Sequence, residues 1–197
     1  MNILIVYAHP EPRSFNGALK DRAAEALTAA GHTVQVSDLY ALDWKANLDA
    51  HDIATPHVDS GFPSLPAEQE HMFAHGRPTF DVEQEQAKIL WCDVLIFQFP
   101  IWWFSMPAIL KGWVDRTMTR GFTYASGEKY DNGKFKGRRA MVCVRPGQPK
   151  ACISRMALTG VSTTFYGRFI TGYSINWGLT NCRHTGLDAG QCVRGRA

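Results

Sequence analysis

Short apolar runs without polar alternation are the strongest pattern in this sequence. Residues 2–7 read Asn-Ile-Leu-Ile-Val-Tyr, and residues 93–99 read Asp-Val-Leu-Ile-Phe-Gln-Phe. Such runs are typical of parallel strands that are covered on both faces. Shorter runs at 33–37 and 139–144 predict two further strands.

Helical periodicity fills the stretches between these strands. After a loop at 8–14, small and apolar residues recur at helical spacing up to Gly31, which stands where a helix terminator belongs. Further helices are expected near 66–75, at 82–90 and, after Pro107, at 108–116. The strand-helix-strand opening predicts an α/β fold with a parallel sheet and right-handed crossovers. Residues 39–82 are rich in Pro, His, Asp and Gly and predict a long excursion over the surface.

Composition adds one irregularity to this picture. The 197 residues, 45% of them apolar, fit one globular domain and exclude a fibrous or disordered chain. The formal charge of +3 is too balanced for a nucleic-acid-binding surface. Residues 1–144 nevertheless hold 14 basic and 17 acidic side chains, net −3, whereas residues 145–197 hold 7 basic side chains and only Asp188, net +6. A change of this kind inside one domain needs a cause.

Several other classes of protein are disfavoured. No apolar run approaches the 18–20 residues of a membrane span, and the first segment is too short for a secretory signal, so a cytoplasmic protein without membrane insertion is expected. The five cysteines form no C-x-x-C pair and are interpreted as incidental thiols. No metal site is expected, and the histidines of the excursion are assigned to solvent: His51, His57, His71 and His75.

The loop after the first strand is a candidate binding site, because ligands of doubly wound sheets bind beyond the carboxyl ends of the strands. Residues 8–16 offer the imidazole of His9, the hydroxyl of Ser14, the amide of Asn16 and the free N–H groups of the next helix. Together these suit a phosphate group. No G-x-G-x-x-G is present. The alternative is that Ser14 or Asn16 only caps the helix.

The loop after the third strand places Trp102, Trp103 and Phe104 between Pro100 and Pro107. Aromatic runs usually belong to a core. Here, however, the chain has just left a buried strand and must turn outward. The arrangement therefore predicts a flat-walled slot for a planar ring system.

These two loops carry a resemblance to a known family. Tyr7-Ala8-His9 through Ser14-Phe15-Asn16, followed by Gln98-Phe99-Pro100-Ile101-Trp102-Trp103-Phe104 through Pro107-Ala108-Ile109-Leu110-Lys111-Gly112-Trp113, resembles the flavodoxin-like NAD(P)H:quinone oxidoreductases, which include DT-diaphorase. The resemblance covers residues 1–144. It implies a flavodoxin-like doubly wound parallel sheet with the strand order 2-1-3-4-5.

The resemblance also implies a function. It suggests a homodimer with FAD, rather than FMN, at the subunit interface, and ping-pong transfer of two electrons from NAD(P)H through the flavin to a quinone. By position, the FAD pyrophosphate would be held by His9, Ser14, Phe15 and Asn16. The ribityl chain and ring system would be flanked by Pro100, Ile101, Trp102, Trp103 and Phe104. Tyr124 matches an aromatic residue that lines the quinone pocket.

The resemblance stops at Val144, where the charge balance also changes. Family members continue with a Thr-Thr-Gly loop, a Tyr and a His at the flavin, a last helix and a fifth strand, but this chain reads Arg145-Pro146-Gly147-Gln148-Pro149. Codons GTG-CGA-CCG-GG for residues 144–147 become GTG-ACG-ACC-GGG, or V-T-T-G, when one A is restored. The same frame can continue as TAEGMYQPDG and, later, LWPIHNG. We therefore interpret residues 145–197 as frame-shifted sequence in place of the end of the domain, which leaves the fifth strand and last helix doubtful.

Other functions remain open from the sequence. One is a regulatory flavoprotein that resembles the ancillary subunits of potassium-efflux systems, and another is an inactive frame-shifted product. A plain electron-transfer flavodoxin is disfavoured by the aromatic loop and the long excursion.

Overall fold

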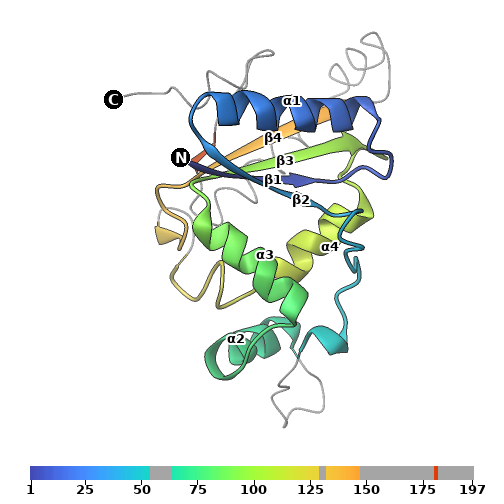
Figure 1. The fold of residues 1–197 in the computed structure, drawn as a ribbon. Coiled ribbons are helices and arrows are strands. Elements are labelled where there is room, and N and C mark those ends of the chain that lie inside the picture. The colour runs from blue at the N-terminus through green and yellow to red at the C-terminus, as the bar shows by residue number, and fades with distance from the viewer. Residues whose placement is uncertain (54–63, 129–131, 147–179, 182–197) are drawn as a thin grey trace, which may run out of the picture.

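A five-stranded parallel sheet organises the residues that the computed structural model describes, namely 1–53, 64–128, 132–146 and 180–181 (Figure 1). The strand order is β2-β1-β3-β4-β5, as the sequence predicted. The strands are β1 (Asn2–Tyr7), β2 (Thr33–Asp38), β3 (Val94–Ile101), β4 (Arg139–Pro146) and β5 (Thr180–Asn181).

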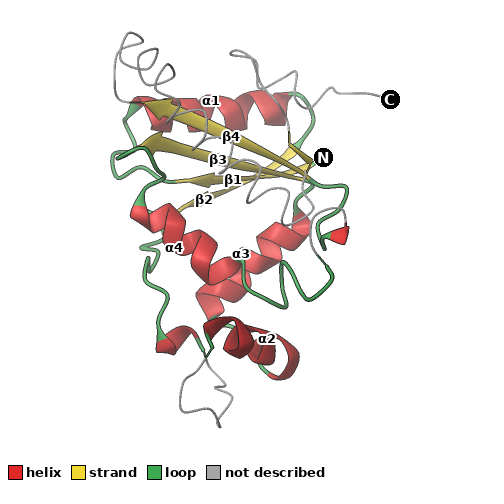
Figure 2. Ribbon diagram, turned by 180° about the vertical axis from the view of Figure 1, so that it is seen from behind, coloured by secondary structure: helices red, strands yellow, loops and turns green. Residues whose placement is uncertain are grey.

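Helices cover both faces of this sheet. Figure 1 shows α1 on one face and α3 and α4 on the other, with α2 farther from the sheet, and Figure 2 shows the same layers from behind. The helices are α1 (Phe15–Ala29), the short 3-10 helix η1 (Ala50–Asp52), α2 (Leu65–His75), α3 (Phe80–Trp91) and α4 (Ala108–Thr117). None of the helices in the described ranges is long and apolar enough to cross a bilayer.

The absence of alternation in β1 and β3 follows from this layering. Alternate residues of both strands, Ile3 and Ile96 among them, pack with Leu27 beneath α1. The residues between them, including Leu4, pack with the fully buried Trp113 on the α3 and α4 side. Each of these side chains therefore enters one of two cores, and its burial stabilises the fold by about 1.5–3 kcal/mol.

Most predicted boundaries agree with the structure within a few residues. Ser14 is the N-cap of α1, and Gly31, whose φ is 84°, follows its end in the left-handed conformation. Strand β3 runs on to Ile101, beyond the predicted 93–99, because it stays paired with β4 as far as Pro146.

The tail contributes four described residues to the sheet, since Arg145 and Pro146 complete β4 and Thr180 and Asn181 form β5. Thr180 and Asn181 pair with Arg139 and Ala140 of β4, so a short fifth strand exists where the sequence left it doubtful. The remainder of the predicted irregular tail and the doubtful last helix lie outside the described residues.

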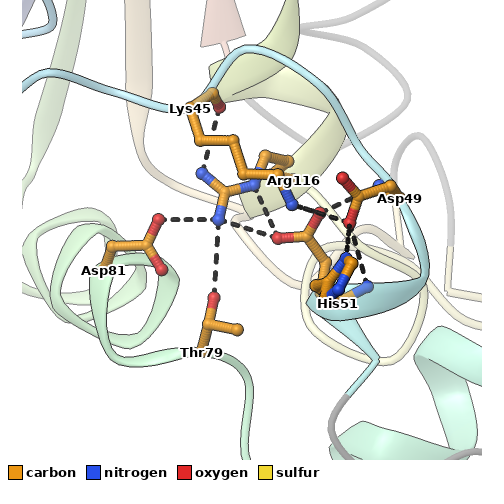
Figure 3. A network of polar contacts seen from close by, with 7 residues as sticks. Lys45, Asp49, His51, Thr79, Asp81 and Arg116 are labelled. Carbon is orange, nitrogen blue, oxygen red and sulfur yellow. Dashed lines mark hydrogen bonds and ion pairs between the residues drawn. The ribbon is translucent and has the colours of Figure 1, made fainter.

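Part of the predicted surface excursion is anchored by a buried ion network around Arg116 of α4 (Figure 3). The Arg116 side chain is 2% exposed. It donates to Asp52 Oδ1 at 2.7 Å, to Asp81 Oδ2 at 2.6 Å and to the carbonyl of Lys45 at 3.1 Å. One side chain therefore joins the excursion, the start of α3 and α4.

Close backbone packing strengthens this anchor. The guanidinium of Arg116 lies 4.5 Å from the ring centroid of Trp44. A Cβ added to Gly112 of α4 would lie 1.9 Å from the carbonyl oxygen of Ala46. Only glycine allows the excursion to approach α4 this closely, so residues 44–52 are part of the packed body.

Candidate functional site

The two candidate loops meet at the carboxyl ends of β1 and β3. Tyr7 of β1 lies opposite Gln98 of β3, and the N–H of Ala8 donates to the carbonyl of Gln98 at 3.1 Å. Beyond the strands, the ring centroids of His9 and Trp102 are 6.2 Å apart, with their planes tilted by 55°. Loops separated by more than eighty residues of sequence thus form one surface, as their positions after adjacent parallel strands predicted.

The first loop ends in the exposed start of α1. The Ser14 hydroxyl accepts the N–H of Gly17 at 3.1 Å, so the expected capping role of Ser14 is present. Phe15 is 56% exposed. A Cβ at Gly17 would lie 1.9 Å from the carbonyl oxygen of Pro12, so the chain packs here at a distance that only glycine permits.

Tyr7 adds a buried hydroxyl beneath this helix start. Its Oη makes no hydrogen bond to any described residue. This oxygen lies next to the helix start, since a Cβ added to Gly17 would be only 3.3 Å from it. Burial raises the pKa of Tyr7 and outweighs the lowering effect of the nearby Ser14 hydroxyl, so the phenol stays a proton donor. An unpaired buried hydroxyl costs about 1–3 kcal/mol. Together with the N–H groups of α1, it fits the phosphate of a nucleotide cofactor.

The second loop is a tight turn built from aromatic residues. The N–H groups of Trp102 and Ser105 each donate to the other residue's carbonyl, at 3.0 and 2.9 Å. The two residues between them, Trp103 and Phe104, have φ values of 48° and 62°. Two consecutive positive φ values are the mark of a type I′ turn, which favours Asn-Gly.

Both the backbone conformation and the solvent exposure of this turn are unusual for aromatic residues. The left-handed conformation costs a side-chain-bearing residue about 1–2 kcal/mol. The rings are also in water, since Trp103 is 94% exposed and Phe104 50%. Backbone strain held in place next to exposed aromatic surface points to a binding function.

The remaining predicted residues divide into two places. Pro100 is buried and Ile101 is half-buried, and both end β3 directly beneath the aromatic turn. Tyr124 lies in a turn after α4, where its carbonyl accepts the N–H of Gly121 at 2.8 Å. Along the chain, α4, which is about 15 Å long, lies between the aromatic turn and Tyr124.

One residue of the site had no predicted role. Gln98 is 3% exposed, and its Nε2 donates to Oδ1 of Asn16, itself 5% exposed, at 2.9 Å. The signal in the sequence is a single amide in an otherwise apolar strand. Its partner could not be identified, because the two residues are far apart in the chain.

Two histidines of the excursion stack on each other. The rings of His71 and His75 in α2 have centroids 4.4 Å apart. His51 lies near Asp49, whereas His57 lies outside the described residues. Within the part of the chain that is described, no three metal-ligating side chains gather.

The described thiols fit a structural interpretation. Cys92 is buried and Cys143 half-buried, and neither forms a disulfide. Burial raises the pKa of Cys92 to about 11 and raises that of Cys143 as well, which makes both poor nucleophiles at neutral pH. The other three cysteines lie outside the described residues.

Known proteins share this fold. A family described as having the flavodoxin-like fold matches residues 1–185. A ribosyldihydronicotinamide dehydrogenase-like protein of Penicillium crustosum is 44% identical over 81% of this chain and 62% of its own length. The ribosyldihydronicotinamide dehydrogenase [quinone] of Mus musculus is 40% identical over 80% of this chain and 68% of its own.

A solved structure agrees with these relatives. A putative quinone reductase from Klebsiella pneumoniae is 41% identical, with a TM-score of 0.85, over 98% of this chain and 80% of that one. The chain thus spans only about two thirds of the length of the two curated relatives. Fold, strand order and relatives agree, and the chain belongs to the flavodoxin-like NAD(P)H:quinone oxidoreductase family.

Proposed function

We propose that this protein is a cytoplasmic, FAD-dependent NAD(P)H:quinone oxidoreductase. The observation that carries the proposal is a strained, exposed aromatic turn beside the start of α1, with an unpaired Tyr7 hydroxyl beneath that helix. Bound flavin would supply the hydride chemistry, and the protein would bind and orient it. Family membership supports the same assignment.

The first loop would hold the phosphates. The N–H groups at the start of α1 and its macrodipole favour an anion. Ser14, Phe15 and Asn16 form this helix start, His9 lies in the loop before it, and Gly17 leaves it without a further side chain. Because Tyr7 stays protonated, it would donate rather than repel.

The second loop would hold the planar ring system. Trp102, Trp103 and Phe104 would contribute flat surface, while Pro100 and Ile101 fix the end of β3 below them. The turn fixes the backbone, so the rings would lose little further freedom when a ligand stacks on them. A single stacking surface favours a ping-pong order, in which NAD(P)H leaves before the quinone binds.

The same proposal includes a homodimer. Trp103 is almost fully exposed, and Tyr124 follows the far end of α4. A second copy would cover the aromatic turn and bring its own Tyr124 to the quinone, which no single chain of this geometry would do. Light scattering of the purified protein tests this part, and a monomer that reduces quinones would refute it.

One assay tests the activity. The purified chain should be yellow, release FAD on denaturation, and oxidise NADPH or NADH when menadione is added. Release of FMN would correct the cofactor alone. A flavin-containing protein without menadione-dependent turnover would favour the regulatory alternative, and a protein that binds no flavin would refute the proposal for this chain.

We further propose that residues 145–197 are frame-shifted. The support is the change from a net charge of −3 in residues 1–144 to +6 in the tail, together with the motifs that one restored base recovers. Sequencing the gene across the Val144 codon tests this proposal, and an intact mass identifies the protein that is made. An unambiguous gene sequence with no base missing, and a mass equal to that of the printed sequence, would leave only a genuine mutation or a divergent C-terminus.

A further inference from the structure

Gln98 joins both cofactor loops through separate groups. Its carbonyl accepts the N–H of Ala8, where the first loop begins, and its side chain donates to Asn16 in the first turn of α1. It also lies two residues before Pro100, where the second loop begins.

The direction of this hydrogen bond decides what Asn16 presents to a ligand. Because Gln98 Nε2 occupies the Asn16 oxygen, the Asn16 amide nitrogen is turned away from Gln98. That nitrogen makes no hydrogen bond among the described residues, and Asn16 is 5% exposed. It is therefore a donor close to the surface, beside the N–H groups of the helix start.

We propose that Gln98 is a positioning residue, which holds the Asn16 amide so that its N–H₂ group faces a flavin phosphate. This inference rests on the proposed function. An asparagine side chain is ambivalent, since its oxygen would repel a phosphate and its nitrogen would bind one. The reverse pairing, with Gln98 Oε1 accepting from Asn16, would turn the repelling oxygen outward.

The backbone around Asn16 is held in place by two contacts. Gly17 packs against Pro12 without room for a Cβ, and Ser14 caps the helix through the Gly17 N–H. The position of the helix start is thus fixed, whereas the side chain of Asn16 could still rotate. The hydrogen bond from Gln98, in a strand at the centre of the sheet, sets the orientation of its amide.

The test compares flavins with and without phosphate on the full chain. Apoprotein is titrated with FAD, FMN and riboflavin, and the quenching of flavin fluorescence gives each Kd. Gln98→Met removes the donor at similar volume and should weaken FAD and FMN about tenfold, the effect of one hydrogen bond to a charged group. Gln98→Glu accepts only, so it should invert the Asn16 amide and weaken both further. Riboflavin affinity should be unchanged in both variants.

A double-mutant cycle separates positioning from structure. In an Asn16→Ala background, Gln98→Met should cause no further loss of FAD affinity, because its effect passes through Asn16. Equal losses for riboflavin and FAD, or additive losses in the double variant, would show that Gln98 is merely structural and overturn the proposal. Unchanged FAD affinity in Gln98→Met would also overturn it, while wild-type turnover would leave the proposed function standing. A wild-type chain that binds no flavin would refute both.

Discussion

The Arg116 network makes the most quantitative prediction, because a single guanidinium holds three parts of the fold (Figure 3). Arg116→Met keeps an unbranched apolar stem and removes the charged guanidinium. Removing one partner of a buried pair typically costs about 3–5 kcal/mol. Asp52 would keep its contact with Lys45 Nζ at 2.9 Å and the N–H of Asp49 at 3.0 Å, and Asp81 is partly exposed. We therefore expect a loss at the lower end, about 3 kcal/mol.

Urea unfolding followed by circular dichroism measures this loss. The midpoint should fall at an unchanged slope, and the melting temperature should fall by roughly 6–12 °C for a chain of this size. Arg22→Met is the matched control, since the pair of Arg22 with Glu25 is exposed and should contribute less than about 1 kcal/mol.

A second variant tests the reason for the loss. If the cost comes from an uncompensated buried carboxylate, then adding Asp52→Leu to Arg116→Met should restore part of the stability. A loss below about 1 kcal/mol in Arg116→Met, or a further loss in the double variant, would refute the reasoning.

Three further predictions concern single residues. The hydrogen bond from Lys45 lowers the pKa of Asp49 to about 2. Because the folded value lies below the unfolded one, its stabilisation is present above about pH 4 and lost as the pH falls through 2, so the difference in urea midpoint between wild type and Asp49→Asn should vanish below that pH. In an ordinary helix, a change from Gly to Ala stabilises the fold by about 0.5–1 kcal/mol. Gly17→Ala should instead lower the melting temperature and weaken FAD binding, because the new Cβ would meet the Pro12 carbonyl. A rise in melting temperature would contradict the close packing. Trp103→Asn should relieve the strained turn and raise the melting temperature of the apoprotein while weakening flavin binding, whereas Trp103→Phe should leave the strain in place.

The local pattern was enough to predict the elements that carry the site. Asn2–Tyr7 could be predicted as a strand, because a short apolar run without polar alternation, here residues 3–7, is typical of a strand buried on both faces. The strand order came from the resemblance, and the position of the two loops then followed from parallel topology. The extension of β3 through Ile101 could not be predicted, because it depends on pairing with β4.

The long-range polar pairs could not be predicted from the sequence, for a different reason. Arg116 and Asp52 have no periodic relation, and either could have been a solvated surface charge. The partner of Gln98 was equally hidden. The left-handed backbone at Trp103 and Phe104 contradicts what their side chains favour, so local preference pointed away from the observed turn.

The pairing of β1 with β3 also has a consequence for the order of events during synthesis. Ile3 lies opposite Val94, so β1 cannot pair with β3 until β3 has left the ribosome. Until then, β2 is the only one of its two neighbouring strands that β1 can pair with. Every residue of both loops has been made once Pro107 is added. At about 5–20 residues per second, the tail follows within several seconds. An altered reading frame after Val144 would therefore meet a nascent chain that already holds both of these loops, and would act on how that chain is completed.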